Sequence, residues 1–267
     1  MIYTLNADEI NRQNGFVGAV GIGIGYKSHS SDSSAISGVV TSLNGSFGWN
    51  WKDYAKMEFS GVLGAGTNNI NGNYPMGVTN SLSNLNFKGG MFLNFGFDGK
   101  GGYNVLSPLK SWDNALFING GANIDILLNS ATYTPFATQF SLLNFFLELE
   151  GRSAINKKWR IDYFVRGLFG ANITSIGGND IQVSSPATQS SVFGGKIGLG
   201  FSYKIGDEAF FFMRLVGTYH HISKGEIIHI AIQNNPQTNG LIANAKTDWR
   251  LPKNHLFYGG LHFGIGI

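Results

Sequence analysis

The sequence predicts an all-β fold, a single antiparallel up-and-down barrel of ten strands that spans a membrane. First, apolar residues alternate with polar or small residues over ten segments of about the 9 to 11 residues that a tilted membrane strand requires. Second, no segment beyond residues 1–14 has a convincing helical period of 3.6. Third, only 13% of the 267 residues are charged, against roughly 25% in a soluble domain.

Composition also limits the other fold classes. No apolar run approaches the roughly 18 residues that a membrane helix needs. Because hydrocarbon satisfies no backbone donor or acceptor, a spanning chain without such helices must form a closed barrel. A soluble β-sandwich is the alternative explanation for the aromatic residues, but so many long alternating strands favour the barrel. The net charge of +3 is small and scattered, so it does not indicate nucleic-acid binding.

Each predicted strand has an apolar face and a polar or glycine face. The strands, in chain order, are residues 16–26, 39–51, 55–65, 85–97, 116–128, 141–153, 159–171, 191–203, 209–221 and 257–267. On the first seven and the last, the apolar face is represented by Ile22, Phe47, Met57, Phe95, Ile124, Leu147, Val165 and Phe263. The opposite faces of all ten carry Gly23, Asn44, Glu58, Asn94, Asp125, Glu148, Arg166, Lys196, Arg214 and His262. The apolar faces are expected to meet lipid and the others to line a lumen.

Connection lengths predict which end of the barrel faces outward. The connections 52–54, 156–158 and 206–208 are short, whereas the alternate ones are long and rich in Ser, Asn, Thr and Gly. Three turn residues between two outward residues keep the apolar faces aligned across a hairpin. An even strand number places both termini at the short-turn end, which is periplasmic in bacterial barrels.

The chain is therefore expected to have two parts. Residues 1–14 form a periplasmic N-terminal segment, and residues 15–267 form the barrel. The expected extracellular loops are residues 27–38, 66–84, 129–140, 172–190 and 222–254. Residues 99–113 break the pattern, because this connection should be short yet contains Gly-Lys-Gly-Gly and a Pro. It is either an insertion or a missed pair of strands, so a twelve-stranded barrel is the alternative.

The predicted lumen is narrow and of mixed charge. Ten strands give an interior little wider than the eight-stranded size that side chains fill. The charged residues expected inside are Lys56, Glu58, Lys88, Asp125, Glu148, Glu150, Arg152, Arg160, Asp162, Arg166, Lys196 and Arg214. A three-residue turn at 156–158 would set Glu148 opposite Arg166. The same register sets Arg152 opposite Asp162, so ion pairs fill the interior. A charged constriction that selects small solutes is the alternative.

Aromatic residues are expected at both membrane interfaces, where amphipathic rings are selected. Those expected near the short turns are Trp49, Trp51, Trp159, Tyr163 and Tyr203, and those near the opposite end are Tyr26 and Tyr219.

The last predicted strand stays in phase to the final residue, from Phe257 to Ile267. This alternation resembles the C-terminal signal of bacterial outer-membrane β-barrels. To close the barrel, the strand must pair with residues 16–26. Glycines occupy the inward faces of both strands, so any opening is expected beside this seam.

The whole chain resembles small outer-membrane proteins of the Helicobacter and Campylobacter type, in its strands rich in Phe, Asn and Ile and in its terminal alternation. The resemblance implies insertion by the barrel-assembly machinery and contact with outer-membrane lipid and lipopolysaccharide. It leaves porin, adhesin and structural roles open. Residues 1–14 lack the apolar region of a signal peptide, so we expect a mature form without its export signal.

Catalytic signals are weak. His221 and Ser223 resemble, over three residues, the His-x-Ser of outer-membrane lipid A deacylases, but Lys224 and Gly225 replace the Asn-Ala of that family. Omptin proteases share a ten-stranded barrel, yet the acidic residues expected at this rim are few and isolated: Asp32, Asp180, Glu226 and Asp248. No His, Asp or Glu cluster has metal-ligand spacing, so neither a metal nor a cofactor is expected.

We therefore expect a monomeric outer-membrane protein with a largely filled lumen that acts as a surface-exposed structural or adhesin-like binding protein. Residues 222–254 are the segment expected to meet a host or surface ligand, and their β-prone sequence predicts a hairpin above the membrane. A small-solute channel is the first alternative. A lipid A-modifying hydrolase is the second.

Overall fold

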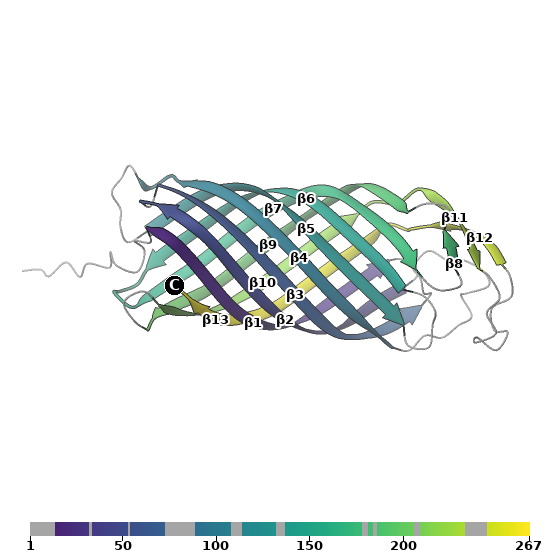
Figure 1. The fold of residues 1–267 in the computed structure, drawn as a ribbon, viewed down its shortest axis with the longest axis horizontal. Coiled ribbons are helices and arrows are strands. Elements are labelled where there is room, and N and C mark those ends of the chain that lie inside the picture. Colours follow the sequence, from purple (N-terminus) through teal and green to yellow (C-terminus); the bar gives the residue numbers. More distant parts are fainter. Residues whose placement is uncertain are drawn as a thin grey trace, which may run out of the picture.

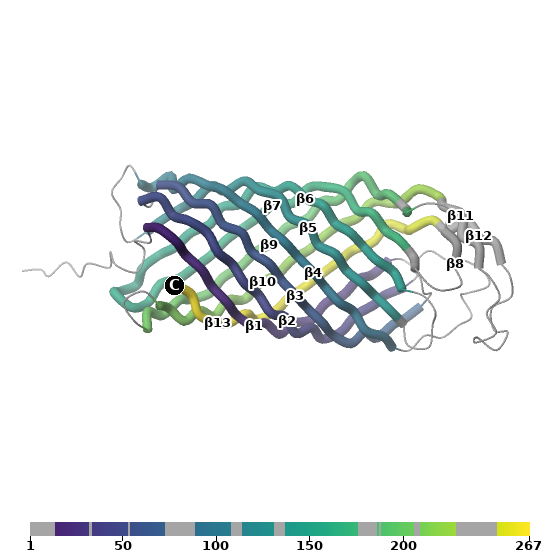
Figure 2. Tube along the Cα trace, in the orientation of Figure 1, coloured from purple at the N-terminus to yellow at the C-terminus, as the bar shows by residue number. Residues whose placement is uncertain are grey.

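The computed structural model describes residues 14–31, 34–52, 54–72, 89–107, 114–131, 137–177, 181–183, 186–205, 209–232 and 245–267. Its strands tilt around one axis and form a closed barrel (Figure 1). The start of β1 and the C-terminus lie at the same end of the barrel, and the tube in Figure 2 follows the same course.

Ten strands form the barrel, and three short ones form a separate sheet. The barrel strands are β1 (Gly15–Ser31), β2 (Ser34–Trp51), β3 (Ala55–Gly72), β4 (Gly90–Asn104), β5 (Asn114–Ala131), β6 (Ala137–Ala154), β7 (Trp159–Gly177), β9 (Ala187–Lys204), β10 (Phe210–Ile222) and β13 (Asn254–Gly266). Each pairs antiparallel with its neighbours, and β13 closes the barrel against β1. The predicted ten-stranded up-and-down barrel is confirmed, and the twelve-stranded alternative is wrong.

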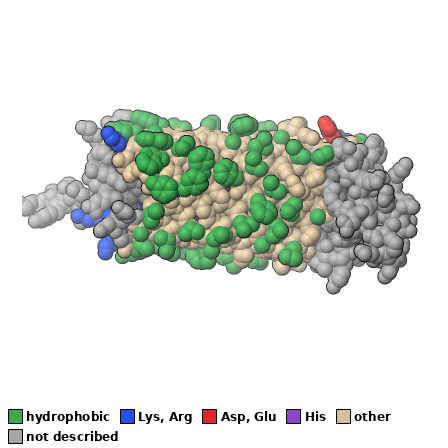
Figure 3. Space-filling view, viewed as in Figure 1, with side chains coloured by type: hydrophobic (Ala, Val, Ile, Leu, Met, Phe, Trp, Pro, Cys, Tyr) green, Lys and Arg blue, Asp and Glu red, His purple; other side chains and the backbone are tan. Residues whose placement is uncertain are grey.

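The outer surface of the barrel carries a belt of exposed apolar side chains. Leu147, Leu215 and Ile197 are among the most exposed. Such exposure would be unfavourable in water, where apolar side chains favour burial. On the face shown in Figure 3, hydrophobic side chains cover the middle of the barrel and the coloured charged ones lie toward its ends. This pattern is the one that hydrocarbon selects. The part of the chain that the structure describes contains no helix long and apolar enough to cross a membrane.

Towards the end opposite the short turns, the polarity of the wall reverses. On β6 the outward residues change from Leu147 and Leu143 to Ser141 and Gln139, while the inward Phe140 is buried. A wall with polar residues outside and apolar residues inside is suited to water on its outer surface. The strands therefore extend beyond the lipid belt as a rim, which we call the extended rim.

The extended rim corrects the expected loops. Residues 27–31 and 34–38 belong to strands, so the connection expected at 27–38 is reduced to two residues. Strand also covers part of the other expected loops, at residues 66–72, 129–131, 137–140, 172–177 and 187–190. Sequence alternation missed these extensions because polar residues replace the apolar ones outside the lipid belt. Residues 1–13 of the expected N-terminal segment lie outside the described residues.

The expected insertion at 99–113 is also wrong in its first part. Strand β4 continues to Asn104, whereas we expected residues 85–97. Glycines at positions 99 and 101 take outward places, so the apolar signal disappears while the strand goes on. Gly102 faces inward, where an added Cβ would lie 1.9 Å from Asn119 Oδ1. The connection to β5 is therefore reduced to residues 105–113, which is still longer than the other turns of this end.

The separate sheet lies beyond the extended rim, with strand order β12-β11-β8 (Figure 1). It consists of β8 (Ile181–Val183), β11 (Ile227–Ile232) and β12 (Ala245–Arg250). Strands β11 and β12 pair antiparallel, which confirms the hairpin expected within 222–254. Its returning strand is β12, and β8 adds a third strand from another connection.

Candidate functional site

The lumen contains a network of charged side chains, which we call the ion-pair network. Its members are Lys56, Glu58, Asp98, Lys100, Glu148, Glu150, Arg152, Arg160, Asp162 and Arg166. They project from β3, β4, β6 and β7, which are consecutive in the barrel wall apart from β5. Alternation along each strand directs them inward, since their neighbours in sequence face lipid.

Glu148 and Glu150 connect most of the network. Lys100 Nζ lies 2.9 Å from Glu148 Oε1 and 2.8 Å from Glu150 Oε2. Glu150 also pairs with Lys56 and, at 3.1 Å, with Arg152 Nη2. On β5, Asn119 Nδ2 donates to Glu148 Oε1 at 2.9 Å. Each of these buried carboxylates therefore faces several donors, as burial of a charge requires.

Arg166 ties β7 to the same network. Its Nη2 lies 2.7 Å from Glu148 Oε2, its Nη1 pairs with Asp98, and its guanidinium stacks 3.6 Å from the centroid of the Phe146 ring. Glu148 and Arg166 are register partners, as the turn length predicted. These contacts cross the lumen from β7 to β4, so they reduce its open cross-section.

Arg152 and Asp162 are also register partners. Each also has an ion-pair partner on its own strand, because Asp162 Oδ1 lies 2.7 Å from Arg160 Nε and Arg152 pairs with Glu150. Side chains on the same strand, two residues apart, share a face and can pair as well as cross-strand neighbours.

Sequence reasoning missed Asp98 and Lys100. Both were assigned to the end of a strand or to an insertion, because the outward face of β4 is glycine at positions 99 and 101. Both residues lie at even spacing from Asn94, so they share its inward face, and this spacing could have identified them. Of the residues expected in the lumen, Lys88 lies outside the described residues.

Above the ion-pair network, towards the extended rim, buried polar side chains such as Asn68, Asn172 and Gln189 share the lumen with a set of buried apolar side chains. We call this set the apolar layer: Ile36, Val40, Phe92, Leu127, Phe140, Leu142, Val192 and Ile222, each 4% exposed or less. His29 packs edge to face on Phe140, with centroids 4.4 Å apart, and its Nε2 lies 2.9 Å from Asn254 Oδ1. The expected interior of ion pairs is thus incomplete, because apolar and uncharged polar side chains pack the interior of the rim.

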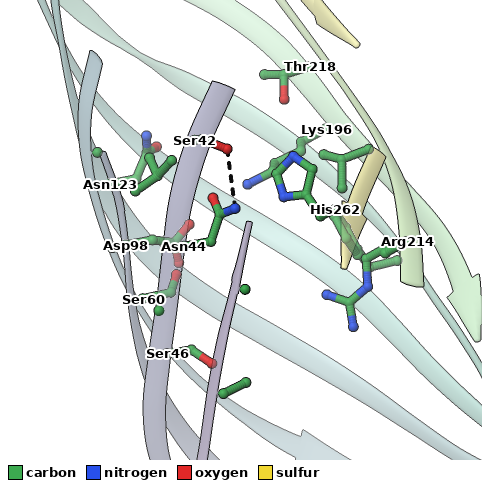
Figure 4. A pocket seen from close by; sticks show the side chains of 18 of the residues that line it. Ser42, Asn44, Ser46, Ser60, Asp98, Asn123, Lys196, Arg214, Thr218 and His262 are labelled. Atoms are coloured by element: carbon green, nitrogen blue, oxygen red, sulfur yellow. Dashed lines mark hydrogen bonds between the residues drawn. The ribbon is translucent and has the colours of Figure 1, made fainter. Parts of the chain in front are cut away.

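A cavity of about 350 Å³ remains beside the network. Ser42, Asn44, Ser46 and Ser60 line one side, and Lys196, Arg214, Thr218 and His262 line the other (Figure 4). Gly21 of β1 and the inward face of β13 border it. This is the position beside the β1–β13 seam where the paired glycines predicted an opening.

The interface aromatics lie at the two ends of the lipid belt. Trp159 packs on Tyr203 of the neighbouring β9, with ring centroids 4.7 Å apart, at the short-turn end. Trp49, Trp51 and Tyr163 are exposed nearer that end, and Tyr26 and Tyr219 nearer the other. Tyr54 and Tyr103, which we did not assign, are exposed at the short-turn end too.

His221 and Ser223 do not form an evident nucleophile and base pair. His221 Nδ1 lies 3.5 Å from His255 Nδ1, and Tyr219 Oη lies 2.6 Å from the same nitrogen. Both backbone polar groups of Ser223 are hydrogen-bonded, since its N–H donates to Ser191 O and its carbonyl accepts from Gln189. The described residues provide no hydrogen bond between His221 and Ser223.

Other site signals are limited. Within the described ranges, no group of three or more His, Cys, Asp or Glu residues could hold a metal ion. Of the acidic residues expected at an omptin-like rim, Asp32 and Asp180 lie outside the described residues, and Glu226 is exposed.

No protein-family model matches the chain. No curated protein matches it either. Among solved structures, the outer membrane protease OmpT from Escherichia coli aligns with a TM-score of 0.63 and 9% identity, covering 94% of this chain and 96% of that one. The translocator domain of the autotransporter NalP from Neisseria meningitidis has a TM-score of 0.40, 9% identity and coverages of 97% and 91%. The outer membrane protein OprG from Pseudomonas aeruginosa has a TM-score of 0.33, 13% identity and coverages of 96% and 96%. At these identities the likeness concerns the fold alone, and the chain has the fold of a bacterial outer-membrane β-barrel.

Proposed function

We propose that this protein is an integral outer-membrane barrel with a closed lumen, which acts at the cell surface as a structural or adhesin-like binding protein. Closure is supported by two sets of side chains that occupy successive levels of the lumen, the ion-pair network and the apolar layer. An aqueous pore would need a continuous polar path, and buried apolar side chains exclude water from such a path.

The extended rim supports the surface role. Its outer face is polar, as at Gln139 and Ser141, and the sheet of β8, β11 and β12 adds further backbone beyond it. We propose that residues 222–254 contact a host or surface ligand, and that the short turns and both termini face the periplasm. Outer-membrane lipid and lipopolysaccharide would surround the apolar belt, and the barrel-assembly machinery would insert the monomer. We also propose that the chain is related to small outer-membrane proteins of the Helicobacter and Campylobacter type.

We also propose that the protein is not an enzyme. The lipid A hydrolase alternative would require His221 to activate Ser223, and the geometry of His221 instead favours contact with His255. The channel alternative has one observation in its favour, the cavity beside the seam, but the cavity lies below the apolar layer.

Planar-bilayer recordings test the closed lumen. We expect the purified barrel to insert without uniform single-channel steps under an applied voltage, because we propose that the side chains packed inside the extended rim close the path for water and ions. A classical porin reconstituted in the same way serves as the positive control, and heat-modifiable mobility on gels verifies that the inserted protein is folded. Reproducible steps of one size would contradict the proposal and favour the small-solute channel.

A further inference from the structure

The cavity beside the seam has a definite extent within the lumen. Its lining begins near the short turns with Val17 and Ile267 and reaches up to Lys27. The next inward residue of β1, His29, belongs to the packed interior of the extended rim and does not line the cavity. The cavity is therefore a pocket that ends against the apolar layer, since Val40, Phe92, Leu127 and Leu142 of that layer line it, and its volume suits a small solute.

The charges that line the cavity are unevenly paired. The cations of the ion-pair network each have a carboxylate partner. Across the residues that the structure describes, no carboxylate lies within ion-pair distance of Lys27, Lys196 or Arg214, which all line the cavity. Among the described carboxylates that line the cavity, Asp125 is the one without a cation within ion-pair distance, and it accepts from Asn123 Nδ2 at 2.6 Å.

Lys27 is the deepest of the three cations. It is 7% exposed, and within the described ranges its Nζ has no hydrogen-bond partner. Its Nζ lies over the face of the Phe92 ring, 4.5 Å from the ring centroid. A buried ammonium without an anionic partner is costly, so a bound anion in the pocket would stabilise it.

Neutral donors complete the pocket. In Figure 4 the Ser42–Asn44 pair, at 3.2 Å from Asn44 Nδ2 to Ser42 Oγ, lies on the wall facing Lys196 and His262. On the far side, Tyr258 Oη lies 2.7 Å from His262 Nε2. Hydroxyls and amides beside cations are the groups that hold oxyanions.

The glycines of the seam create the required space. An added Cβ at Gly23 would lie 2.6 Å from Ser42 Oγ and 3.1 Å from His262 Cδ2. Any larger residue would therefore displace the two side chains that flank the cavity. Glycine on this wall leaves room for a solute, whereas the opposite wall carries the ion-pair network.

We propose that this pocket binds a small oxyanion, a solute bearing a carboxylate or phosphate group, through Lys196 and Arg214, with Lys27 at its inner end. An excess of cations in a confined, partly desolvated space attracts such ligands strongly. The inference goes beyond the proposed surface role, and it does not depend on whether the lumen conducts.

Isothermal titration of the folded barrel in neutral detergent at low ionic strength tests this inference, with inorganic phosphate and succinate as the two probes. We expect at least one probe to bind, and the Lys196→Met and Arg214→Met variants each to weaken it by about tenfold or more. The matched control is Lys253→Met, an exposed lysine directly before β13 that does not line the pocket. It should bind as the unmodified protein does.

A second variant keeps the proposal testable if removal of a cation prevents folding. Ser42→Asp adds a carboxylate to the wall opposite Lys196 and should also weaken binding by about tenfold, since the new anion competes with the ligand. Binding of phosphate but not succinate, or the reverse, would define the oxyanion. The proposal is overturned if neither probe binds the unmodified protein, or if the folded variants bind as tightly as it does.

Discussion

Glu150→Gln is expected to lower the free energy of unfolding of the barrel by about 3 to 5 kcal/mol, the cost typical of breaking a buried ion pair by removing one partner. Glu150 accepts from Lys56, Lys100 and Arg152, which come from three different strands. The amide has the same shape, so it leaves the cations in place without the charge that compensates them. Urea unfolding in lipid vesicles, followed by tryptophan fluorescence, measures the difference.

The matched control is Glu226→Gln. Glu226 is exposed and lies outside the barrel strands, so the same chemical change should alter the free energy of unfolding by less than about 0.5 kcal/mol. Equal effects at Glu150 and Glu226 would mean that the lumen is solvated, and the ion-pair network would then contribute little to stability.

Leu215→Arg is expected to destabilise the inserted barrel by about 2 to 4 kcal/mol, because its side chain faces the middle of the lipid belt. Leu215 is 62% exposed and lies beside Leu199 and Leu261 of the neighbouring strands. On β10 it lies midway between Tyr219 and the residue that pairs with Tyr203. These tyrosines mark the two interfaces, so an arginine here cannot reach water easily.

The same change at Ile227 provides the control. Ile227 is 55% exposed, similar to Leu215, but it belongs to β11 beyond the extended rim. Because water surrounds that position, Ile227→Arg should change stability by less than about 1 kcal/mol. Folding into vesicles and urea unfolding measure both variants. A neutral Leu215→Arg would show that the apolar face of β10 does not meet hydrocarbon.

The sequence was sufficient for the strand number and register because lipid imposes period-two alternation directly on the chain. The turn at 156–158 fixed the pairing of Glu148 with Arg166, since parity across a short hairpin allows few registers. The terminal strand likewise had to pair with the first, because an open edge is not tolerated in hydrocarbon.

Other features could not be read from alternation. Outside the lipid belt the outward residues are polar, as at Ser28 and Ser30, so strand and loop have the same composition. On β4 two outward glycines removed the signal, which hid Lys100 although it contacts both Glu148 and Glu150. The apolar layer was missed for a related reason, since its members are scattered across six strands and meet only when the barrel closes.

The assignment of every side chain to lipid or lumen depends on closure between β1 and β13, so the most direct measurement is an intramolecular disulfide across this seam. Val20 and Ile265 are register partners on the outward face, within the Cα separation that a disulfide permits, and the chain has no native Cys. We expect Val20→Cys with Ile265→Cys to cross-link within one chain after oxidation of the folded protein in membranes. Val20→Cys with Phe263→Cys, one outward position out of register, should react far more slowly. Absence of the first cross-link, its appearance only between chains, or faster reaction of the second pair would contradict the closed barrel.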